Sequence, residues 1–379
     1  MAGEIYSSDG VNVDLGDSAS KFAAKVCQAS YTFSPIANVV DTSNGNFRGP
    51  RAIQLKPEFD SSFCFWSCAP DGIGTKVVLT DAVGTHILSA YDLLAMTSFD
   101  LVRWGGIPVY MTSVLDVSSL GESIESPTYN AVLNLYAGLL KAAEKSGIIV
   151  LNGETAELSS LVSSENPNAT LMYNWGASVH GLFHPDKMIT GGNIEEGNIV
   201  IAFKENGFRS NGISSVRKAF KMKFGDNWFN KQIAFESIMA AAVPSILYDR
   251  VFVDANGWLE DERIDIKGIV HVTGGSFESK LGDLLYRKGL SAYLYDLYPL
   301  PDIMRQCADW REMTDRDLYK TWNAGQGALA IVDKNDVDIL LSIAEKHNID
   351  AKVCGEITKR DFPSITIISK YKGGLVEFN

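Results

Sequence analysis

Cysteine and basic residues are both scarce in this sequence. Its five cysteines are odd in number and scattered over 379 residues, so they do not make the framework of a disulfide-stabilised secreted domain. The 34 basic residues are outnumbered by 46 acidic ones, which gives a formal charge of −12. That balance argues against nucleic acid or an anionic membrane as the main partner. We expect a reducing cytoplasm as the compartment, and any anionic ligand needs a local site of its own.

Long apolar runs are also missing. No uninterrupted apolar stretch reaches the length of a membrane-spanning helix. The segment 1–7 lacks a basic region followed by an apolar core, so no secretory signal is expected there. With 46% hydrophobic and 21% charged residues, the composition is that of an ordinary globular protein.

The length and the order of predicted elements indicate two domains. A chain of 379 residues is too long for one ordinary core. Strands and helices are mixed in both halves, and the glycine- and acid-rich segment 191–197 separates them. We therefore predict a mixed α/β protein with one domain over residues 1–192 and another over residues 193–379.

The segment Asp71-Gly72-Ile73-Gly74-Thr75-Lys76 combines residue types that bind metal and phosphate. It follows the aromatic run 63–68, which predicts a buried strand, and its glycines let the backbone turn and approach a ligand closely. Asp71 is suited to a divalent cation, Thr75 and the loop amides to phosphate oxygens, and Lys76 to their charge. The spacing differs from the Walker pattern. A plain strand-to-helix turn with a solvated lysine is the alternative.

Two carboxylates further along the first domain are also candidates for binding a metal or phosphate-bound cation. A helix predicted over 86–104 places Asp100 about one turn from its end, where the helix dipole disfavours an acid, so a compensating cation or metal is expected. An aspartate paired with a nearby arginine is the alternative. Glu154 directly follows a predicted strand over 147–151, so two strands deliver carboxylates to loop positions.

The remaining elements of the first domain have clear signals. A helix over 127–146 is marked by Ser126 as its cap, Pro127 at its first position and Gly147 just past its end. An amphipathic helix is expected over 18–29, and strands over 107–116 and 171–183. Residues 30–57, with Arg48 and Arg51, have the composition of a mobile loop, which is either a functional lid or a disordered surface segment.

Two pairs of potential metal ligands receive structural interpretations. Cys64 and Cys68 would point to the same side of a strand, and no second pair completes a zinc site, so buried free thiols are expected. His180 and His184 have helical spacing, but the neighbouring Gly181 and a following proline disfavour a helix there. We expect no metal role for that pair.

Two loops of the second domain are suited to anions. The segment 207–212 lies between a strand predicted over 198–203 and a helix that runs to about Lys223, and a helix start of this kind binds anions. Simple capping by Ser210 or Asn211 is the alternative. The pattern recurs at 273–277, after a strand. Strands are predicted over 268–272, 328–332 and 364–369, and the third of these is the last strand expected in the chain. A helix is predicted over 337–347.

Six short motifs occur in a fixed order along the chain. They are Gly-Val-Asn-Val-Asp-Leu-Gly, Asp-Gly-Ile-Gly-Thr-Lys, Gly-Glu-Thr-Ala-Glu, Ser-Asn-Gly, His-Val-Thr-Gly-Gly and Asn-Ala-Gly-Gln-Gly. From about Tyr6 to the C-terminus this set resembles the AIR synthase family, the phosphoribosylformylglycinamidine cyclo-ligases of purine biosynthesis. The resemblance implies a two-domain α/β protein whose N-terminal domains pair in a homodimer, with ATP bound near the dimer contact.

The resemblance also implies a reaction and its cofactors. The family uses ATP and Mg²⁺ to phosphorylate an amide oxygen of formylglycinamidine ribonucleotide, and a ring-closing nitrogen then expels phosphate to give aminoimidazole ribonucleotide. Phosphoryl transfer needs mainly positioning and neutralisation of charge. Acids that hold a metal, a lysine and loops of glycine amides can supply both.

Site roles follow from the resemblance position by position. The expected metal carboxylates are Asp71, Asp100 and Glu154. The expected ATP and phosphate contacts are Asp71, Gly72, Gly74, Thr75, Lys76 and His86. The expected substrate contacts are Glu154, Ser210, Asn211, Gly212, Thr273, Gly274 and Gly275. The expected catalytic residues are Lys76, Asp100 and Arg209.

This chain departs from the family pattern in three places. Arg209 stands where the family has histidine before Ser-Asn-Gly, and arginine stays protonated, so it can stabilise charge but not move a proton near neutral pH. Ser276 replaces a glycine, and the loop over 31–52 has few basic residues. Two other functions stay open: another ATP-dependent phosphoryl transfer, and a catalytically idle nucleotide-binding paralogue. A selenide enzyme is disfavoured, because Cys27 lies on a predicted helix.

Overall fold

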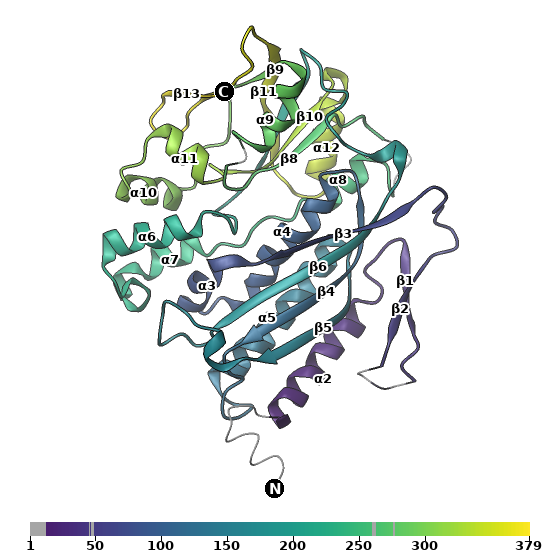
Figure 1. The fold of residues 1–379 in the computed structure, drawn as a ribbon, viewed down its shortest axis with the longest axis vertical. Helices are drawn as coiled ribbons and strands as arrows, with labels where there is room; N and C mark the ends of the chain where they lie inside the picture. Colours follow the sequence, from purple (N-terminus) through teal and green to yellow (C-terminus); the bar gives the residue numbers. More distant parts are fainter. Residues whose placement is uncertain (1–12, 45, 47–48, 260–262, 276) are drawn as a thin grey trace. The chain divides into compact units, whose positions relative to one another are not determined.

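The computed structural model describes residues 13–379 apart from 45, 47–48, 260–262 and 276 (Figure 1). Arg48, Ser276 and the start of the first family motif therefore lie outside the described residues. The chain divides into two compact units. Unit 1 comprises residues 1–101 and 108–182, and unit 2 comprises residues 102–107 and 183–379. The chain thus changes unit shortly before the boundary that we predicted at residue 192, and the sequence gives no sign that 102–107 belongs to unit 2.

Unit 1 is built on a four-stranded sheet with the strand order β3-β6-β4-β5. Its strands are β3 (Phe65–Gly72), β4 (Ile107–Val117), β5 (Ile149–Glu157) and β6 (Tyr173–Phe183). Its helices are α2 (Val13–Ser30), α3 (Val77–Ala82), α4 (Ser89–Val102) and α5 (Pro127–Ser146). The predicted helices and strands of this part are confirmed. The main difference is that β5 continues through the Asn-Gly-Glu motif, which we had placed in a loop.

The sheet of unit 1 has one covered and one open face. Along β4 and β6, buried residues alternate with more exposed ones, so each strand turns a single face to the core. Figure 1 shows α4 and α5 behind these strands. On the open face, the Tyr110 and His180 rings stack with centroids 4.6 Å apart, and Trp66 contacts Tyr110. Trp66 and Val114 are among the large apolar side chains that remain exposed.

Helix α5 begins and ends as its sequence predicts. The Ser126 side chain accepts a hydrogen bond from the amide of Tyr129, and Pro127 occupies the first helical position. Gly147 ends the helix with a φ of 70°, a left-handed conformation that glycine adopts without steric cost.

Two expectations for the N-terminal region are wrong. The segment predicted as a mobile loop contains an antiparallel hairpin of β1 (Ala37–Asp41) and β2 (Arg51–Leu55), paired from Ala37 with Leu55 to Asp41 with Arg51. The strand predicted as buried is β3, and most of its residues are exposed. Cys64 and Cys68 are free thiols, but Cys64 is half-buried and Cys68 is exposed. An aromatic run predicts a strand well but does not show whether a helix covers it.

Unit 2 is built on a seven-stranded sheet with the strand order β13-β12-β9-β11-β7-β10-β8. Its strands are β7 (Ile199–Lys204), β8 (Gly268–His271), β9 (Leu290–Leu294), β10 (Gln326–Val332), β11 (Ala351–Lys359), β12 (Ile365–Ile368) and β13 (Leu375–Phe378). The pairs are antiparallel except for β9 with β12. Every residue of β10 is buried, as expected of an interior strand covered on both faces.

Helices surround the sheet of unit 2. They are α6 (Ile213–Phe224), α7 (Phe235–Ala241), α8 (Asp249–Ala255), α9 (Lys280–Leu285), α10 (Asp302–Trp310), α11 (Asp315–Thr321) and α12 (Val337–Lys346). Strands β7, β8, β10 and β12 and helices α6 and α12 are confirmed, whereas β9, β11 and β13 were not predicted, and β13 rather than β12 is the last strand. Within the described part of the chain, no helix is long and apolar enough to cross a membrane.

Candidate functional site

The open face of the unit 1 sheet holds a shallow cavity of about 510 Å³, which we call the sheet cavity. It lies over β3, β4 and β6, and its lining consists of Pro70, Asp71, Gly72, Thr112, Ser113, Val114, Asn174, Gly176, Ala177 and Ser178. The amide of Ile73 donates to the carbonyl of Trp175 at 3.0 Å, which fixes the end of β3 against β6. Asp71 and Gly72 of the predicted phosphate loop therefore border a cavity that is mostly apolar and whose polar lining includes Thr112, Ser178 and Asn174.

The predicted phosphate loop has an exposed half and a buried half. Asp71, Gly74 and Thr75 are exposed, and Gly74 has a φ of 66°. One Asp71 carboxylate oxygen accepts the amide of Gly72 at 2.7 Å. The first five residues of the loop thus present a carboxylate, a hydroxyl and a flexible backbone to solvent.

Lys76 lies in the interior and not at the surface. Its ammonium donates to Oδ1 of Asp92 at 2.8 Å, and both side chains are fully buried. The alternative of a solvated lysine is therefore wrong, whereas the predicted phosphate contact of Lys76 stays a prediction. A buried charge requires a partner of opposite charge, and Asp92 on α4 supplies it. This pair anchors the exposed part of the loop to the interior.

His86 is likewise a buried residue. Its Nε2 lies 3.0 Å from Oδ1 of Asp81, and its side chain is almost fully covered. The same carboxylate accepts the amides of Thr170 and Leu171 at 3.2 and 2.9 Å. The expectation that His86 contacts ATP is therefore not supported, because the pair ties the start of α4 to the segment that leads into β6.

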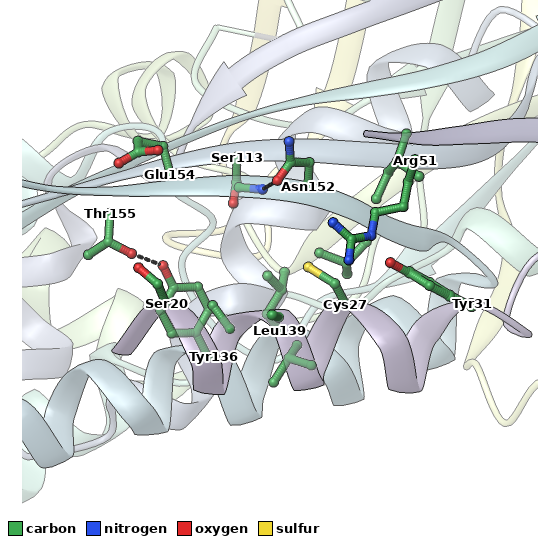
Figure 2. Close-up of a pocket in the computed structure, with 16 residues that line it drawn as sticks. Ser20, Cys27, Tyr31, Arg51, Ser113, Tyr136, Leu139, Asn152, Glu154 and Thr155 are labelled. Carbon is green, nitrogen blue, oxygen red and sulfur yellow. Dashed lines mark hydrogen bonds between the residues drawn. The ribbon is translucent and has the colours of Figure 1, made fainter. Parts of the chain in front are cut away.

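A second cavity of unit 1, about 350 Å³ in volume, lies between α2, α5 and β5, and we call it the helix cavity (Figure 2). Asn152, Glu154 and Thr155 line it from β5, Ser20 and Cys27 from α2, and Tyr31 from just past the end of α2, as Figure 2 shows. Arg51 of the β1–β2 hairpin also lines it. Ser113 belongs to the lining of both cavities.

The charged groups of the helix cavity are Arg51 and Glu154. Burial raises the pKa of the Tyr136 hydroxyl to about 12 and the pKa of the Cys27 thiol to about 11, so both stay protonated near neutral pH. The Tyr136 hydroxyl is hydrogen-bonded to that of Thr155. This cavity therefore offers hydroxyl and amide groups with one charge of each sign, and Cys27 does not act as a nucleophile there.

The three carboxylates predicted to share one metal do not form such a group. Among the described residues, no three His, Cys, Asp or Glu side chains lie together as a metal site. Asp71 borders the sheet cavity and Glu154 borders the helix cavity, whereas Asp100, half-buried on α4, lines neither. The three acids are therefore not gathered in this part of the chain, because β3 and β5 are separated by two strands and Asp100 lies on α4, and their role as metal ligands stays a prediction.

The predicted substrate loops of unit 2 do come together. A Cβ built on Gly274 would lie 3.5 Å from the Cβ of Asn211 and 3.1 Å from the carbonyl oxygen of Thr321. The indole N–H of Trp322 donates to the carbonyl of Gly212 at 3.1 Å. Loop 210–212, loop 273–275 and the segment 321–323 thus form one cluster, although they are far apart in the sequence.

The start of α6 lacks the simple capping that was our alternative. Its cap residue is Gly212, with a φ of 76° and no side chain to cap the helix. The Ser210 hydroxyl is buried, and among the described residues it has no hydrogen-bond partner. A buried polar atom without a partner is unusual, and amides at a helix start attract anions. Both features fit a loop that binds an anionic group.

Arg209 is enclosed by the protein. Its side chain is 1% exposed, and its guanidinium donates to Oε2 of Glu205 at 2.7 Å and to Nε2 of His271 at 2.9 Å. The guanidinium is thus held in the interior by Glu205 and His271, and a catalytic role of Arg209 stays a prediction. The backbone amide of Arg209 donates to Oδ1 of Asn323 at 3.5 Å, and the Asn323 amide group donates to the carbonyl of Gly207 at 3.1 Å.

Several residues of these sites were missed from the sequence. Ser113 and Asn174 line the sheet cavity, and their polar neighbours on alternate positions of β4 and β6 were the available signal. Lys280 was also missed. Its ammonium donates to Oγ1 of Thr273 at 3.1 Å and to the carbonyl of His271 at 3.3 Å. Only the fold shows that the first residue of α9 turns back to loop 273–275.

Two family models match the chain across both units. The model described as AIR synthase related protein, N-terminal domain, matches residues 66–175, and the model of the C-terminal domain matches residues 195–368. The chain belongs to the AIR synthase family. A phosphoribosylformylglycinamidine cyclo-ligase of Alkaliphilus oremlandii is 26% identical over 360 residues, covering 93% of this chain and 97% of that relative. One of Methanocaldococcus jannaschii is 26% identical and covers 76% of each chain.

Solved structures show the same fold. A thiamine-monophosphate kinase of Stenotrophomonas maltophilia has a TM-score of 0.60 at 14% identity, with 92% of this chain and 96% of that chain covered. The hydrogenase maturation protein HypE in complex with ATP has a TM-score of 0.59 at 12% identity, with coverage of 89% and 90%. T. maritima PurL complexed with FGAR has a TM-score of 0.53 at 15% identity, with coverage of 94% and 52%. These likenesses place the chain in the AIR synthase fold.

Proposed function

We propose that the protein catalyses the ATP-dependent cyclisation of formylglycinamidine ribonucleotide to aminoimidazole ribonucleotide, with release of ADP and phosphate. The observation that carries this proposal is the match to both AIR synthase domains together with cyclo-ligase relatives that span nearly the whole chain. The ATP complexes of HypE and PurL support ATP as the cofactor, and the PurL complex with FGAR supports a ribonucleotide as the substrate.

The chemistry of this reaction suits the groups that the structure leaves exposed. The γ-phosphoryl group of ATP passes to an amide oxygen. The ring-closing nitrogen then attacks the carbon that carries this oxygen, and the carbon–oxygen bond breaks with release of phosphate. The nitrogen loses a proton in the process. Such transfers depend on positioning and charge rather than on a protein nucleophile. Among the described residues of both cavities, the one thiol with a raised pKa, Cys27, is not suited to nucleophilic attack.

We assign the nucleotide phosphates to the exposed half of the phosphate loop, Asp71, Gly72, Gly74 and Thr75. The ribonucleotide is assigned to Ser210, Asn211, Gly212, Thr273, Gly274 and Gly275, whose loops form one cluster in unit 2. Glu154, in the helix cavity, is a further proposed substrate contact, and Asp100, half-buried on α4, stays a predicted catalytic residue. Lys76, His86 and Arg209 support these loops from the interior.

The donor set of unit 1 fits Mg²⁺ bound jointly with ATP. Magnesium in ATP-dependent sites keeps several waters and takes one or two protein carboxylates plus phosphate oxygens, so a three-acid cage is not required. Asp71 is exposed beside the sheet cavity and supplies such a carboxylate. When bound, the ion would neutralise charge on the transferring phosphoryl group.

A homodimer that pairs through the open face of the unit 1 sheet completes the proposal. Trp66 and Val114 are each 48% exposed on that face, and the Tyr110 and His180 rings stack on the neighbouring strands β4 and β6. An uncovered sheet face with aromatic and aliphatic side chains is typical of a protein interface. A reducing cytoplasm is the proposed location, in keeping with five free cysteines.

The test is an assay of the purified full-length chain with formylglycinamidine ribonucleotide, ATP and Mg²⁺. The proposal predicts equal amounts of ADP, phosphate and aminoimidazole ribonucleotide. ATP consumption without the aminoimidazole product would favour another phosphoryl transfer, and tight ATP binding without turnover would favour a catalytically idle paralogue. Either result would overturn the proposed reaction.

A further inference from the structure

A buried charge cluster joins three segments of unit 2 beneath the predicted substrate loops. Arg209 lies at its centre. Its guanidinium contacts Oε2 of Glu205 at 2.7 Å, the carbonyl of Ile246 at 3.3 Å and Nε2 of His271 at 2.9 Å. Glu205, Arg209 and His271 are all at most 2% exposed. The three side chains therefore have almost no contact with solvent.

The hydrogen bonds fix the protonation of His271. A guanidinium has only donors and does not lose its proton in proteins, so Nε2 of His271 must accept. His271 is therefore neutral, with its proton on Nδ1. The Lys280 ammonium on the carbonyl of the same residue adds a second positive charge close by. Protonation of the ring would place three positive charges together in the interior.

Glu205 compensates the charge of Arg209. Its Oε2 accepts Arg209 and lies 3.4 Å from the hydroxyl of Tyr248, while its Oε1 accepts the amides of Asn206 and Ile246 at 3.0 and 3.3 Å. Burial raises the pKa of Tyr248 well above its usual value, so this hydroxyl stays a donor. Arg209 thus holds the carboxylate as a cation beside several neutral donors. Removal of the Arg209 charge would weaken this compensation.

The cluster reaches both substrate loops through the backbone. Arg209 directly precedes Ser210, and His271 lies two residues before Thr273. The two loops meet where Gly274 faces Asn211. A change of the Arg209–His271 contact therefore moves one loop relative to the other.

We infer that Arg209 is a positioning residue whose permanent charge keeps His271 neutral and holds loops 210–212 and 273–275 in a pH-independent arrangement for the phosphate-bearing ribonucleotide. This inference rests on the proposed function for the identity of the ligand. The arrangement of the cluster itself does not depend on that function. A histidine at position 209, as in the family, would make the same contact dependent on its protonation.

The decisive variant is Arg209→Met, which keeps much of the length of the side chain and removes the charge. His271 is then free to protonate and to compensate Glu205, so its pKa is expected to rise above the unfolded value of about 6.5. A histidine whose pKa is higher in the folded than in the unfolded protein stabilises the folded state at pH values below the pKa of the unfolded protein. That stabilisation is lost as the pH rises through the pKa of the folded protein. The variant should therefore be more stable, and bind better, at about pH 6 than at about pH 8.

Three measurements test this on the full chain. The first follows the ring protons of His271 by NMR against pH, with His271→Asn to assign the signal among five histidines. The second is the unfolding temperature against pH. The third is KM for formylglycinamidine ribonucleotide. In the variant, KM should rise about tenfold from pH 6 to pH 8, as expected for a shift of about one pKa unit. In the wild type, KM should show only the pH-dependent changes that both proteins share.

The double variant Glu205→Gln with Arg209→Met serves as the control. It removes both charges, so it should lose the pH dependence and unfold at a higher temperature than the single variant. A His271 signal that titrates near pH 6.5 in the wild type, or that does not titrate in Arg209→Met, would overturn the inference. Because NMR and unfolding need no turnover, a failure of the proposed cyclisation leaves this result readable on its own.

Discussion

At the scale of single residues, burial separates groups that the sequence treats alike. Asp71 and Lys76 belong to one short motif, yet Asp71 is exposed beside a cavity and Lys76 is fully buried against Asp92. The motif could be recognised in the sequence because its residue types suit phosphate chemistry. The burial of Lys76 could not be predicted, because its partner Asp92 lies on another helix and no local sequence feature marks the pair.

Asp71→Asn is predicted to weaken Mg²⁺-dependent ATP binding by about tenfold or more while the protein stays folded. The amide keeps the size of the side chain but removes the charge that a divalent cation requires. Isothermal titration with an ATP analogue and Mg²⁺ measures the effect. Asp361→Asn, at an exposed position of unit 2, is the matched control and should bind as the wild type does. Equal affinity in both variants would show that the nucleotide binds elsewhere.

Lys76→Met is predicted to destabilise the protein by about 3–5 kcal/mol, because it leaves the buried Asp92 carboxylate without its cation. Denaturant unfolding followed by fluorescence measures this loss. Adding Asp92→Leu to Lys76→Met removes the orphaned charge and should recover most of the stability. If Lys76→Met unfolds like the wild type but no longer binds ATP, the lysine contacts phosphate after all.

At the scale of elements, local signals identified those whose ends are marked by caps and glycines. Helix α5 has its serine cap, its proline and its final glycine where the sequence places them. The β1–β2 hairpin was taken for a loop because its strands are short and its polar residues face solvent. Strands β9 and β13 were missed although Gly289 and the Gly373-Gly374 pair mark turns before them, because both strands are short. Strand β11 was missed because its pairing with β7 and β9, far away in the sequence, defines it.

The loop that opens α6 gives an element-scale prediction. In Gly212→Ala, the new methyl would lie 2.6 Å from the carbonyl oxygen of Thr321 and 2.7 Å from Cδ1 of Trp322, so the loop must shift. We expect KM for the ribonucleotide to rise about tenfold or more, as is typical when positioning is lost. Gly289→Ala has a similar φ of 66° and open space around its Cβ.

That control should lose about 1–2 kcal/mol of stability through backbone strain and keep the KM of the wild type. A rise of KM in both variants would point to a general loss of order in unit 2. An unchanged KM in Gly212→Ala would show that loop 210–212 does not position the substrate.

At the scale of the whole molecule, the resemblance of six ordered motifs identified the family, and both domain models confirm it. Composition and periodicity alone reached only a two-domain α/β protein. The three acids do not lie together, because Asp71 and Glu154 are on strands that the sheet order keeps apart and Asp100 is on α4. Loops 210–212 and 273–275, by contrast, lie close together because they follow β7 and β8, and both of these strands pair with β10.

The open sheet face predicts the oligomeric state. Trp66→Glu places a charge in the proposed dimer contact, so the mass measured by light scattering should fall from that of a dimer to that of a monomer of about 41.4 kDa. Ile233→Glu, at a 79% exposed position of unit 2, is the control and should leave the dimer intact. A wild-type chain that is already a monomer at micromolar concentration would contradict the pairing.

The most direct test of the central claim follows the oxygen atom that leaves. Formylglycinamidine ribonucleotide labelled with ¹⁸O at the amide oxygen is incubated with the enzyme, ATP and Mg²⁺, and the released phosphate is analysed by mass spectrometry. Phosphorylation of that oxygen predicts one ¹⁸O atom in each phosphate, formed in step with aminoimidazole ribonucleotide. Unlabelled phosphate, with the label released to water, would show that ATP hydrolysis is separate from ring closure and would contradict the account.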